Sequence, residues 1–169
     1  MTDPLPDLGT ADPHRRVRDA AAERGLDIEL RAFPPAASLE EAAAHRGVDP
    51  SEIVKTLVVK GRGEQYLFAL VPGDRAISWP KLRKAVGANR LRLPEPHLAL
   101  EATGYERGTI VSIGSSTAWP VFADARVVGR RVSMGSGARH VALYVDADRL
   151  IEAYDATVAD ITDPIDTIR

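Results

Sequence analysis

The chain has 169 residues, of which 44 % are hydrophobic and 27 % are charged, a composition typical of one globular domain with its own core. It has no cysteine, which excludes disulfide bonds, a thiolate nucleophile and cysteine-ligated metals. The net charge of −2 argues against a globally basic nucleic-acid-binding protein. Cysteine-free composition fits a cytoplasmic protein. No signal-peptide core or apolar run of the roughly 20 residues that span a bilayer is found.

The first third of the chain predicts two helices around one strand. Residues 1–12 are rich in Pro, Asp and Gly and are expected to form a flexible tail, ahead of a single domain over residues 13–169. A helix is predicted over 13–24, and the alternation of "LDIELRAF" (26–33) predicts a strand. Ser38 and Glu41 have the spacing of a capping box before the helix "LEEAAAHR", which Gly47 ends.

The middle of the chain predicts a hairpin followed by two helices. After the tight turn "DPSE", residues 53–60 and 64–72 predict two strands joined through "GRG". Ser78 is placed to cap a short helix that ends at Gly87. "NRLRLP" (89–94) alternates as a short strand, and "PHLALEATG" (96–104) predicts a two-turn helix that ends at its glycine.

The last third of the chain predicts mainly short strands. Asp146 is placed to cap a final helix, "ADRLIEAY". Short strands with brief turns and irregularly placed helices favour an α+β fold, with a curled, mostly antiparallel, barrel-like sheet and flanking helices, over a doubly wound parallel sheet. The four predicted strands are "WPVFAD" (119–124), "ARVVG" (125–129), "RRVSMG" (130–135) and "RHVALYVD" (139–146).

Lys55 is the most unusual residue of the predicted strands. In "IVKTLVVKG" (53–61) it lies near the start of a strand and shares a face with Ile53, Leu57 and Val59. Lysine is almost never fully buried without a partner. Three interpretations stay open on the pattern alone: a guard on an edge strand, a side chain that reaches out to water, or a functional group.

Two segments rich in small residues are candidate binding loops. "GYERGTIVSIGSST" (104–117) can direct backbone N–H groups at an anion or a carbonyl, but it lacks the P-loop pattern, and an ordinary connecting loop is the more common explanation of such a segment. "SMGSGARH" (133–140) can line a pocket, with His140 as a general base or donor. The four histidines lie far apart, so no metal site is predicted.

Basic side chains are concentrated in two stretches. "KLRKAVGANRLR" (81–92) carries five Lys and Arg residues and no acid, and "ARVVGRR" (125–131) adds three arginines. Either stretch can face a phosphate backbone, but such clusters are more often simply solvated.

The ordered set of motifs resembles the YbaK/ProX family of aminoacyl-tRNA deacylases, which is related to the editing domain inserted in bacterial prolyl-tRNA synthetases. The resemblance covers roughly residues 36–162. It is carried by "IVKT" (53–56), "VPGD" (71–74), "TGY" (103–105) with the glycine loop that follows, "WPVFAD" and "RVSMGSGARHVALYVDADRLI". It implies a compact α+β fold whose pocket takes the 3′ end of a mischarged tRNA, often that for proline, with no metal or organic cofactor.

The resemblance also implies roles for individual residues. The lysine matching Lys55 is the key residue of the family's site, and it is expected here to anchor the substrate. Backbone N–H groups at Gly108 and Thr109 are expected to stabilise the oxyanion. Lining residues are expected to be Phe33, Thr56, Ser112, Gly114, Ser133 and His140. Lys81, Arg83, Lys84 and Arg130 are expected to contact tRNA phosphates. The implied partner is the acceptor end of an aminoacyl-tRNA, with a synthetase as a further candidate.

The chain departs from the family pattern at two places. Ser112 stands where family loops commonly carry proline, and "RHVALYV" lacks the acidic residue of the cysteine-specific branch. The alternative hypothesis is therefore a binding module of the same fold, which holds a tRNA end, a nucleotide or a protein without catalysis. The sequence leaves open the amino acid, the tRNA, the attacking group and the oligomeric state.

Overall fold

The structure, a computed structural model, describes residues 13–165, so the predicted tail over residues 1–12 lies outside the described part of the chain. Within that part, no helix is both long and apolar enough to cross a membrane. The helices are α1 (Pro13–Glu23), α2 (Leu39–Arg46), α3 (Trp79–Val86), α4 (Pro96–Thr103) and α5 (Ala147–Ala153). The strands are β1 (Ile28–Ala32), β2 (Val54–Lys60), β3 (Tyr66–Pro72), β4 (Arg75–Ile77), β5 (Val121–Asp124), β6 (Arg131–Gly135), β7 (Val141–Asp146), β8 (Thr157–Ala159) and β9 (Thr162–Pro164).

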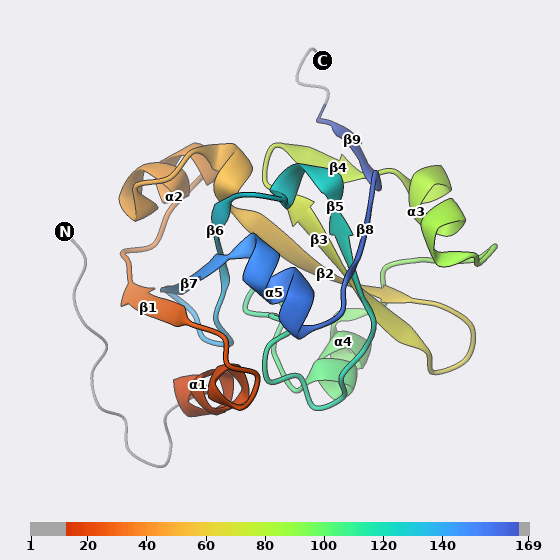
Figure 1. Cartoon of the computed structure of the whole chain (residues 1–169), viewed down its shortest axis with the longest axis horizontal. Coiled ribbons are helices and arrows are strands. Elements are labelled where there is room, and N and C mark those ends of the chain that lie inside the picture. The colour runs from red at the N-terminus through yellow and green to blue at the C-terminus, as the bar shows by residue number, and fades with distance from the viewer. Residues whose placement is uncertain (1–12, 166–169) are drawn as a thin grey trace.

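The strands form three sheets, and the α+β prediction is confirmed (Figure 1). One sheet has the order β1-β7-β6 and is antiparallel throughout. The second has the order β2-β3-β5-β8; its β2–β3 pair is the predicted hairpin, whereas β3–β5 and β5–β8 are parallel. The third is the short antiparallel pair β4–β9. Only the second sheet is therefore mixed, and the three sheets do not close into a barrel.

The predicted helix ends are confirmed where local chemistry defines them. Ser38 accepts a hydrogen bond from the Glu41 amide and Ser78 from the Lys81 amide, which are N-cap contacts. Gly47 ends α2 in the left-handed conformation, with φ of 68°. One part of the capping box differs, because the Glu41 carboxylate accepts from the Ala37 amide rather than from Ser38.

Two predicted strands are wrong. Residues 125–127 form a 3₁₀ turn instead of a strand, because the carboxylate of Asp124 accepts a hydrogen bond from the Arg126 amide and caps that turn. In the segment 89–94, only Arg92 pairs, in an isolated bridge to Lys60. The short strands β4, β8 and β9 went unpredicted, since three residues show no periodicity.

Hydrophobic side chains cover both faces of β3. Phe68 and Leu70 point into a core between the two larger sheets, to which α1 and α5 contribute. Leu67, Ala69 and Val71 point the other way, into a second cluster closed by α3 and the β9 end of the chain. Burial on both faces explains why the sequence of this strand is continuously apolar.

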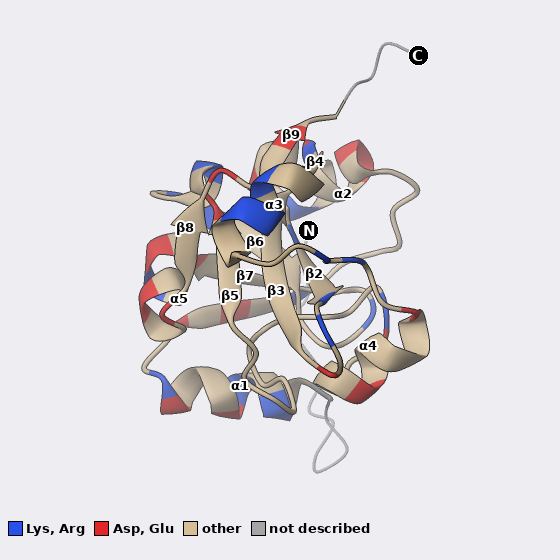
Figure 2. Ribbon diagram, turned by 90° about the vertical axis from the view of Figure 1, so that its right-hand side faces the viewer, with Lys and Arg blue, Asp and Glu red and all other residues tan. Residues whose placement is uncertain are grey.

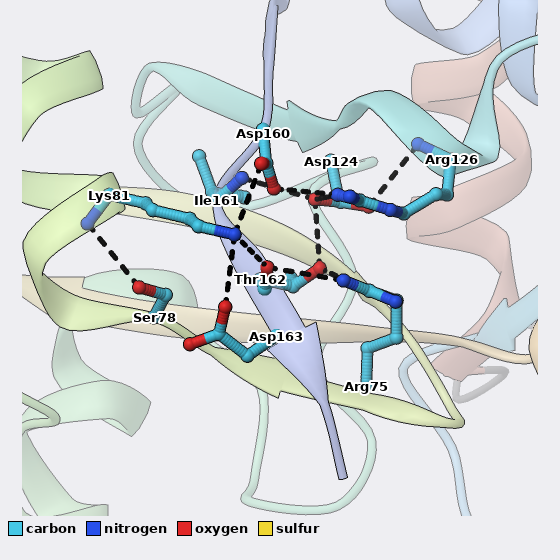
Figure 3. Close-up of polar contacts among 9 residues, drawn as sticks. All are labelled: Arg75, Ser78, Lys81, Asp124, Arg126, Asp160, Ile161, Thr162 and Asp163. Carbon is cyan, nitrogen blue, oxygen red and sulfur yellow. Dashed lines mark hydrogen bonds and ion pairs between the residues drawn. The ribbon is translucent and has the colours of Figure 1, made fainter.

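A polar network attaches the β8–β9 segment to the second cluster (Figure 3). At its centre the fully buried Asp124 carboxylate accepts from the Ile161 amide at 3.1 Å and from Thr162 Oγ1 at 2.9 Å. Arg126 reaches Asp160 at 2.6 Å, and Lys81 reaches it at 3.1 Å. Hydrogen bonds from these two cations, of which that from Arg126 has the larger effect, lower the pKa of Asp160 to about 2.

This network predicts an acid dependence of stability. The pKa of Asp160 lies below its ordinary value of 3.8, so its stabilising contribution is complete above that value and is lost as the pH falls through about 2. We expect the free energy of unfolding of the wild type to fall more steeply between about pH 4 and pH 2 than that of Asp160→Asn, in urea titrations at each pH.

Asp27→Asn is the matched control, because Asp27 is exposed and has no ion pair among the described residues. It should keep the wild-type slope. An Asp160→Asn protein with an unchanged acid slope would contradict the role assigned to this carboxylate.

Candidate active site

Strand β2 is attached at both ends and has a free edge between them. Near its start, Ile53 forms a parallel bridge to Ser133 of β6. At its end, the Lys60 amide donates to the Arg92 carbonyl at 2.7 Å and the Arg92 amide donates back at 3.1 Å. Because backbone groups alternate sides along a strand, Thr56 and Val58 also direct their N–H and C=O groups away from β3.

This free edge opens onto a cavity of about 640 Å³. The described residues that line it include three with formal charge, Arg46, Lys55 and Arg107, and neither Asp nor Glu. The cavity is therefore a positively charged site without a carboxylate of its own. Its walls are residues 33–36, 53–58 and 107–108, together with Ser38, Ala42, His45, Arg46, Leu93, Pro94, Pro96, Ala99, Ile110, Met134, Gly135, Ala138, His140, Val141 and Ala142.

The structure brings five of the sequence-predicted site residues together on this cavity: Phe33, Lys55, Thr56, Gly108 and His140. Residues 109, 112, 114 and 133 lie outside the lining. The Oγ1 of Thr56 is buried and has no hydrogen-bond partner among the described residues, so it is available to a ligand. His140 is exposed, adopts a left-handed φ of 61°, and its carbonyl accepts from the Phe33 amide at 2.8 Å.

The ammonium of Lys55 is bonded within the protein. Its Nζ donates to the Arg75 carbonyl at 2.8 Å, in a half-buried position. Burial lowers the pKa of Lys55, and the nearby carboxylate of Asp74 opposes that shift. Although β2 is an edge strand, a half-buried ammonium held by a carbonyl differs from the expected solvated guard. An ammonium has three donors, so two are left for a substrate.

Of the two backbone N–H groups that the sequence analysis assigns to the oxyanion, at Gly108 and Thr109, one is already engaged within the loop over 107–110. Gly108 lines the cavity in a left-handed conformation, with φ of 90°. The Thr109 amide donates to the Glu106 carbonyl at 3.0 Å, and its hydroxyl donates to the same oxygen at 2.7 Å. The amide expected to share in an oxyanion hole is thus engaged in a turn, and Gly108 is the better candidate of the two.

A single guanidinium holds both ends of the glycine loop over 104–114. Arg16 of α1 donates to the carbonyls of Thr103 at 2.7 Å and Gly104 at 3.3 Å, and also to the carbonyl of Gly114. Its Cζ lies 4.5 Å from the centre of the Tyr105 ring. Although Ser112 replaces the family's usual proline, the loop is fixed by these contacts.

The segment around Ser112 belongs to the core rather than to the cavity surface. Ser112 is buried, its Oγ has no partner among the described residues, and its neighbours Val111 and Ile113 pack in the main core. The hydroxyl of Tyr105 donates to the Ile113 carbonyl at 2.8 Å, and burial raises the pKa of Tyr105 to about 12. Gly114 faces Arg16 and Tyr105 and is a structural residue in this arrangement.

Arg46 is a cavity residue that sequence reasoning missed. It is the last residue of α2, and its Nη1 donates to the buried Oγ of Ser133 at 3.2 Å. A basic residue in the last turn of a helix is ordinary, because it complements the helix dipole, so the sequence carries no signal for it. Among residues 13–165, no group of three or more His, Asp or Glu side chains is arranged to hold a metal ion.

The expected tRNA-binding residues differ in their surroundings. Lys81 is committed to Asp160, Asp163 and the Thr162 carbonyl (Figure 3). In contrast, Arg83 and Lys84 have no ion pair within the described part of the chain. Arg130 Nη1 donates to Ser51 Oγ at 3.0 Å.

A second groove, of about 970 Å³, lies beside α3. It is formed by the tip of the β2–β3 hairpin, the segment after α3 and residues 119–120 and 122. Its charged lining residues are Arg62 and Arg90. Tyr66 and Trp119 form a tilted ring pair in its wall, with centroids 5.2 Å apart.

Comparison with known proteins agrees with the family resemblance. Residues 33–153 match the model of the aminoacyl-tRNA editing domain family. The chain belongs to this family. Helix α1, which supplies Arg16, lies outside the matched residues.

Proline–tRNA ligases are among the relatives. That of Thermosipho melanesiensis is 36 % identical over 104 residues, which are 62 % of this chain and 18 % of that protein. The enzyme of Nitratidesulfovibrio vulgaris strain DP4 is 33 % identical over 136 residues, 78 % of this chain and 24 % of that protein. The chain thus spans only about a fifth of the length of these ligases.

A solved structure of similar size matches nearly the whole chain. The crystal structure of a protein described as a candidate trans-editing enzyme for prolyl tRNA synthetase superposes with a TM-score of 0.81 at 27 % identity. The match covers 92 % of this chain and 99 % of that one. The editing-domain fold is therefore complete in the chain.

Removing the Arg16 side chain tests the loop clamp. Arg16→Ala loses three charge-assisted hydrogen bonds to loop carbonyls, and we expect the free energy of unfolding to drop by about 2–4 kcal/mol. Amide hydrogen exchange should rise across residues 104–114. Arg15→Ala, an exposed neighbour on the same helix, should change neither quantity. Unchanged loop protection in Arg16→Ala would refute the clamp.

Proposed function

We propose that this editing domain is an aminoacyl-tRNA deacylase that acts in trans and hydrolyses the ester of a mischarged tRNA. The observation that carries the proposal is the acid-free cavity at the free edge of β2, where Lys55, Thr56, Gly108 and His140 meet. The phosphates of the substrate's terminal nucleotides fit a site whose formally charged residues are all cationic.

Lys55 anchors the substrate in this proposal. Its ammonium has donors left after the bond to the Arg75 carbonyl, and a charge-assisted hydrogen bond to the ester carbonyl or to a ribose oxygen uses them. Covalent attack by Lys55 is not part of the scheme, since water is a sufficient nucleophile for an activated ester and the Lys55 ammonium serves as a hydrogen-bond donor.

The Gly108 N–H stabilises the oxyanion that develops when water attacks the ester. A positioned donor of this type is worth about 3–4 kcal/mol in hydrolases. An aminoacyl ester is already activated, so water with modest assistance is sufficient. Thr56 Oγ1, which is buried and has no partner among the described residues, and His140, which also lines the cavity, are the polar groups that orient the sugar or the water.

The body of the tRNA lies against the face that carries α3 and the second groove. Figure 2 shows Lys and Arg on α3 and on neighbouring segments of that face. Arg62, Lys84 and Arg90 are exposed there, and Arg83 is half-buried. The segment over residues 91–94 lies between the cavity and the groove, since Leu93 lines the cavity and Leu91 lines the groove. An RNA strand that leaves the cavity along this segment therefore reaches these cations. Lys81, held by two aspartates, contributes less.

Mischarged tRNA for proline is the substrate that the relatives favour, since the curated matches are proline–tRNA ligases. A synthetase of that specificity is the partner that generates such a substrate. Small apolar differences between amino acids change the specificity of a pocket only about 10–200-fold. The identity of the amino acid that is removed is therefore a matter for measurement on mischarged tRNAs.

Loss of the Lys55 side chain should abolish deacylation. We expect Lys55→Ala to lower kcat/KM on the best mischarged tRNA by at least about 100-fold, comparable with loss of an oxyanion-hole donor, while circular dichroism and Tm show a folded protein. Lys60→Ala is the matched control: it removes a lysine at the end of the same strand, outside the cavity lining, and should retain activity.

A panel of mischarged tRNAs decides between deacylase and binding module. Wild-type turnover in Lys55→Ala would contradict the assigned anchor. Binding of charged tRNA without hydrolysis of any panel member would instead favour the module that only holds a tRNA end.

A further inference from the structure

Arg46 is a cation in the cavity wall without an anionic partner. Its guanidinium makes one hydrogen bond within the described residues, from Nη1 to Ser133 Oγ at 3.2 Å. Arginine carries five N–H donors, so most of its hydrogen-bonding capacity is unused in the protein.

The acidic groups nearest in the sequence and sheet register are engaged elsewhere. Glu29, opposite Tyr144 in the β1–β7 pair, is bonded to Arg31 at 2.9 Å and Arg131 at 3.2 Å. Glu41, on the same helix as Arg46, accepts from the Ala37 amide at 3.0 Å. Asp49, three residues after Arg46, accepts from the Ser51 amide at 3.0 Å and from the Ser51 hydroxyl at 2.7 Å. None of these three carboxylates forms an ion pair with Arg46.

Half-burial makes this missing partner significant. Burial lowers the pKa of Arg46, which means that the charged form has lost part of its hydration. Charged side chains withdrawn from water are normally paired. Arg107, the other arginine of the lining, is exposed, and water can satisfy it.

A purely structural role accounts for only part of the arrangement. The hydroxyl of Tyr144 donates to the Arg46 carbonyl at 2.8 Å and attaches the end of α2 to β7. That bond uses the backbone of Arg46, so it persists in any side-chain variant. The guanidinium itself makes one hydrogen bond to a hydroxyl, a bond that a neutral donor could also make. A structural role therefore does not account for its positive charge.

We propose that Arg46, oriented by Ser133, forms a phosphate subsite that binds the 5′ phosphate of the terminal nucleotide of the substrate. The inference rests on the proposed function, because it places an ester-linked nucleotide in the cavity. In an aminoacylated RNA end, the 5′ phosphate on the terminal ribose is the negative charge nearest to the ester. A planar guanidinium binds phosphate oxygens in pairs, which also fixes the orientation of the nucleotide.

Binding of AMP and adenosine tests the subsite without any catalytic step. We expect isothermal titration of the wild type to show AMP bound at least about tenfold more tightly than adenosine, and Arg46→Gln to bind the two equally. Arg46→Lys should recover part of the preference, as a point charge without the paired geometry. Arg149→Gln, which removes an exposed arginine of α5 that lines neither the cavity nor the groove, is the matched control and should keep the wild-type preference.

Kinetics separate a subsite from a structural role. Arg46→Gln should raise KM for aminoacyl-tRNA by about tenfold and leave hydrolysis of 3′-aminoacyl-adenosine, which has no phosphate, unchanged. Equal losses on both substrates, or no preference for AMP in the wild type, would overturn the inference. So would a preference for aspartyl-adenosine over alanyl-adenosine that Arg46→Gln removes, because the guanidinium would then read the amino acid.

The outcomes for this inference and for the proposed function are distinguishable. If the wild type hydrolyses no charged tRNA, but its preference for AMP disappears in Arg46→Gln, the phosphate subsite is supported and the deacylase activity is refuted. If the wild type hydrolyses charged tRNA, but the ratio of its affinities for AMP and adenosine is the same in Arg46→Gln, the deacylase activity is supported and the phosphate subsite is refuted.

Discussion

The interrupted pairing of strand β2 is the constraint on which the candidate site depends. Ile53 joins the strand to β6 at one end and Lys60 joins it to Arg92 at the other, while no strand of the described residues lies along the edge between them. The loop at 109–110 packs against Gly135 of β6, where a side chain would lie 2.8 Å from the Ile110 carbonyl. Continued pairing of β6 with β2 would fill the space that the cavity occupies.

The cations of the interior and those of the surface have different partners. Lys55, Arg46 and Arg16 donate to carbonyl or hydroxyl oxygens, and none of the three forms an ion pair with a carboxylate of residues 13–165. Lys81 and Arg126, at the surface, share Asp160 in ion pairs. A chain with a net charge of −2 thereby keeps a locally positive cavity, and this local excess matters more for an RNA end than the overall charge.

Sequence reasoning was most successful where neighbouring residues determine the structure. Ser38, Gly47 and Ser78 mark helix ends through contacts within four residues, and the hairpin of β2 and β3 follows from apolar runs around a short turn. The prediction of a strand over 125–129 was wrong because Asp124 caps a 3₁₀ turn there, and this local contact outweighed the apolar pattern. The rules for helix ends would have allowed such a cap.

The site was only partly predictable for the same reason. The strand pattern singled out Lys55, the small-residue segment 133–140 pointed to His140, and the family resemblance added Phe33 and Thr56. All four line the cavity. The destination of the Lys55 ammonium on the Arg75 carbonyl is set by contacts across sheets. The unpaired charge of the half-buried Arg46 likewise depends on which groups of the described residues lie beside it, and no sequence pattern records that.

A crystal structure with a non-hydrolysable 3′-aminoacylamino-adenosine tests the central claim most directly. We predict that the nucleoside occupies the cavity along Thr56 and Val58, with the amide carbonyl within hydrogen-bonding distance of Lys55 Nζ or the Gly108 N–H. A ligand bound instead in the groove beside α3, or one bound in the cavity without contact to either group, would contradict the account.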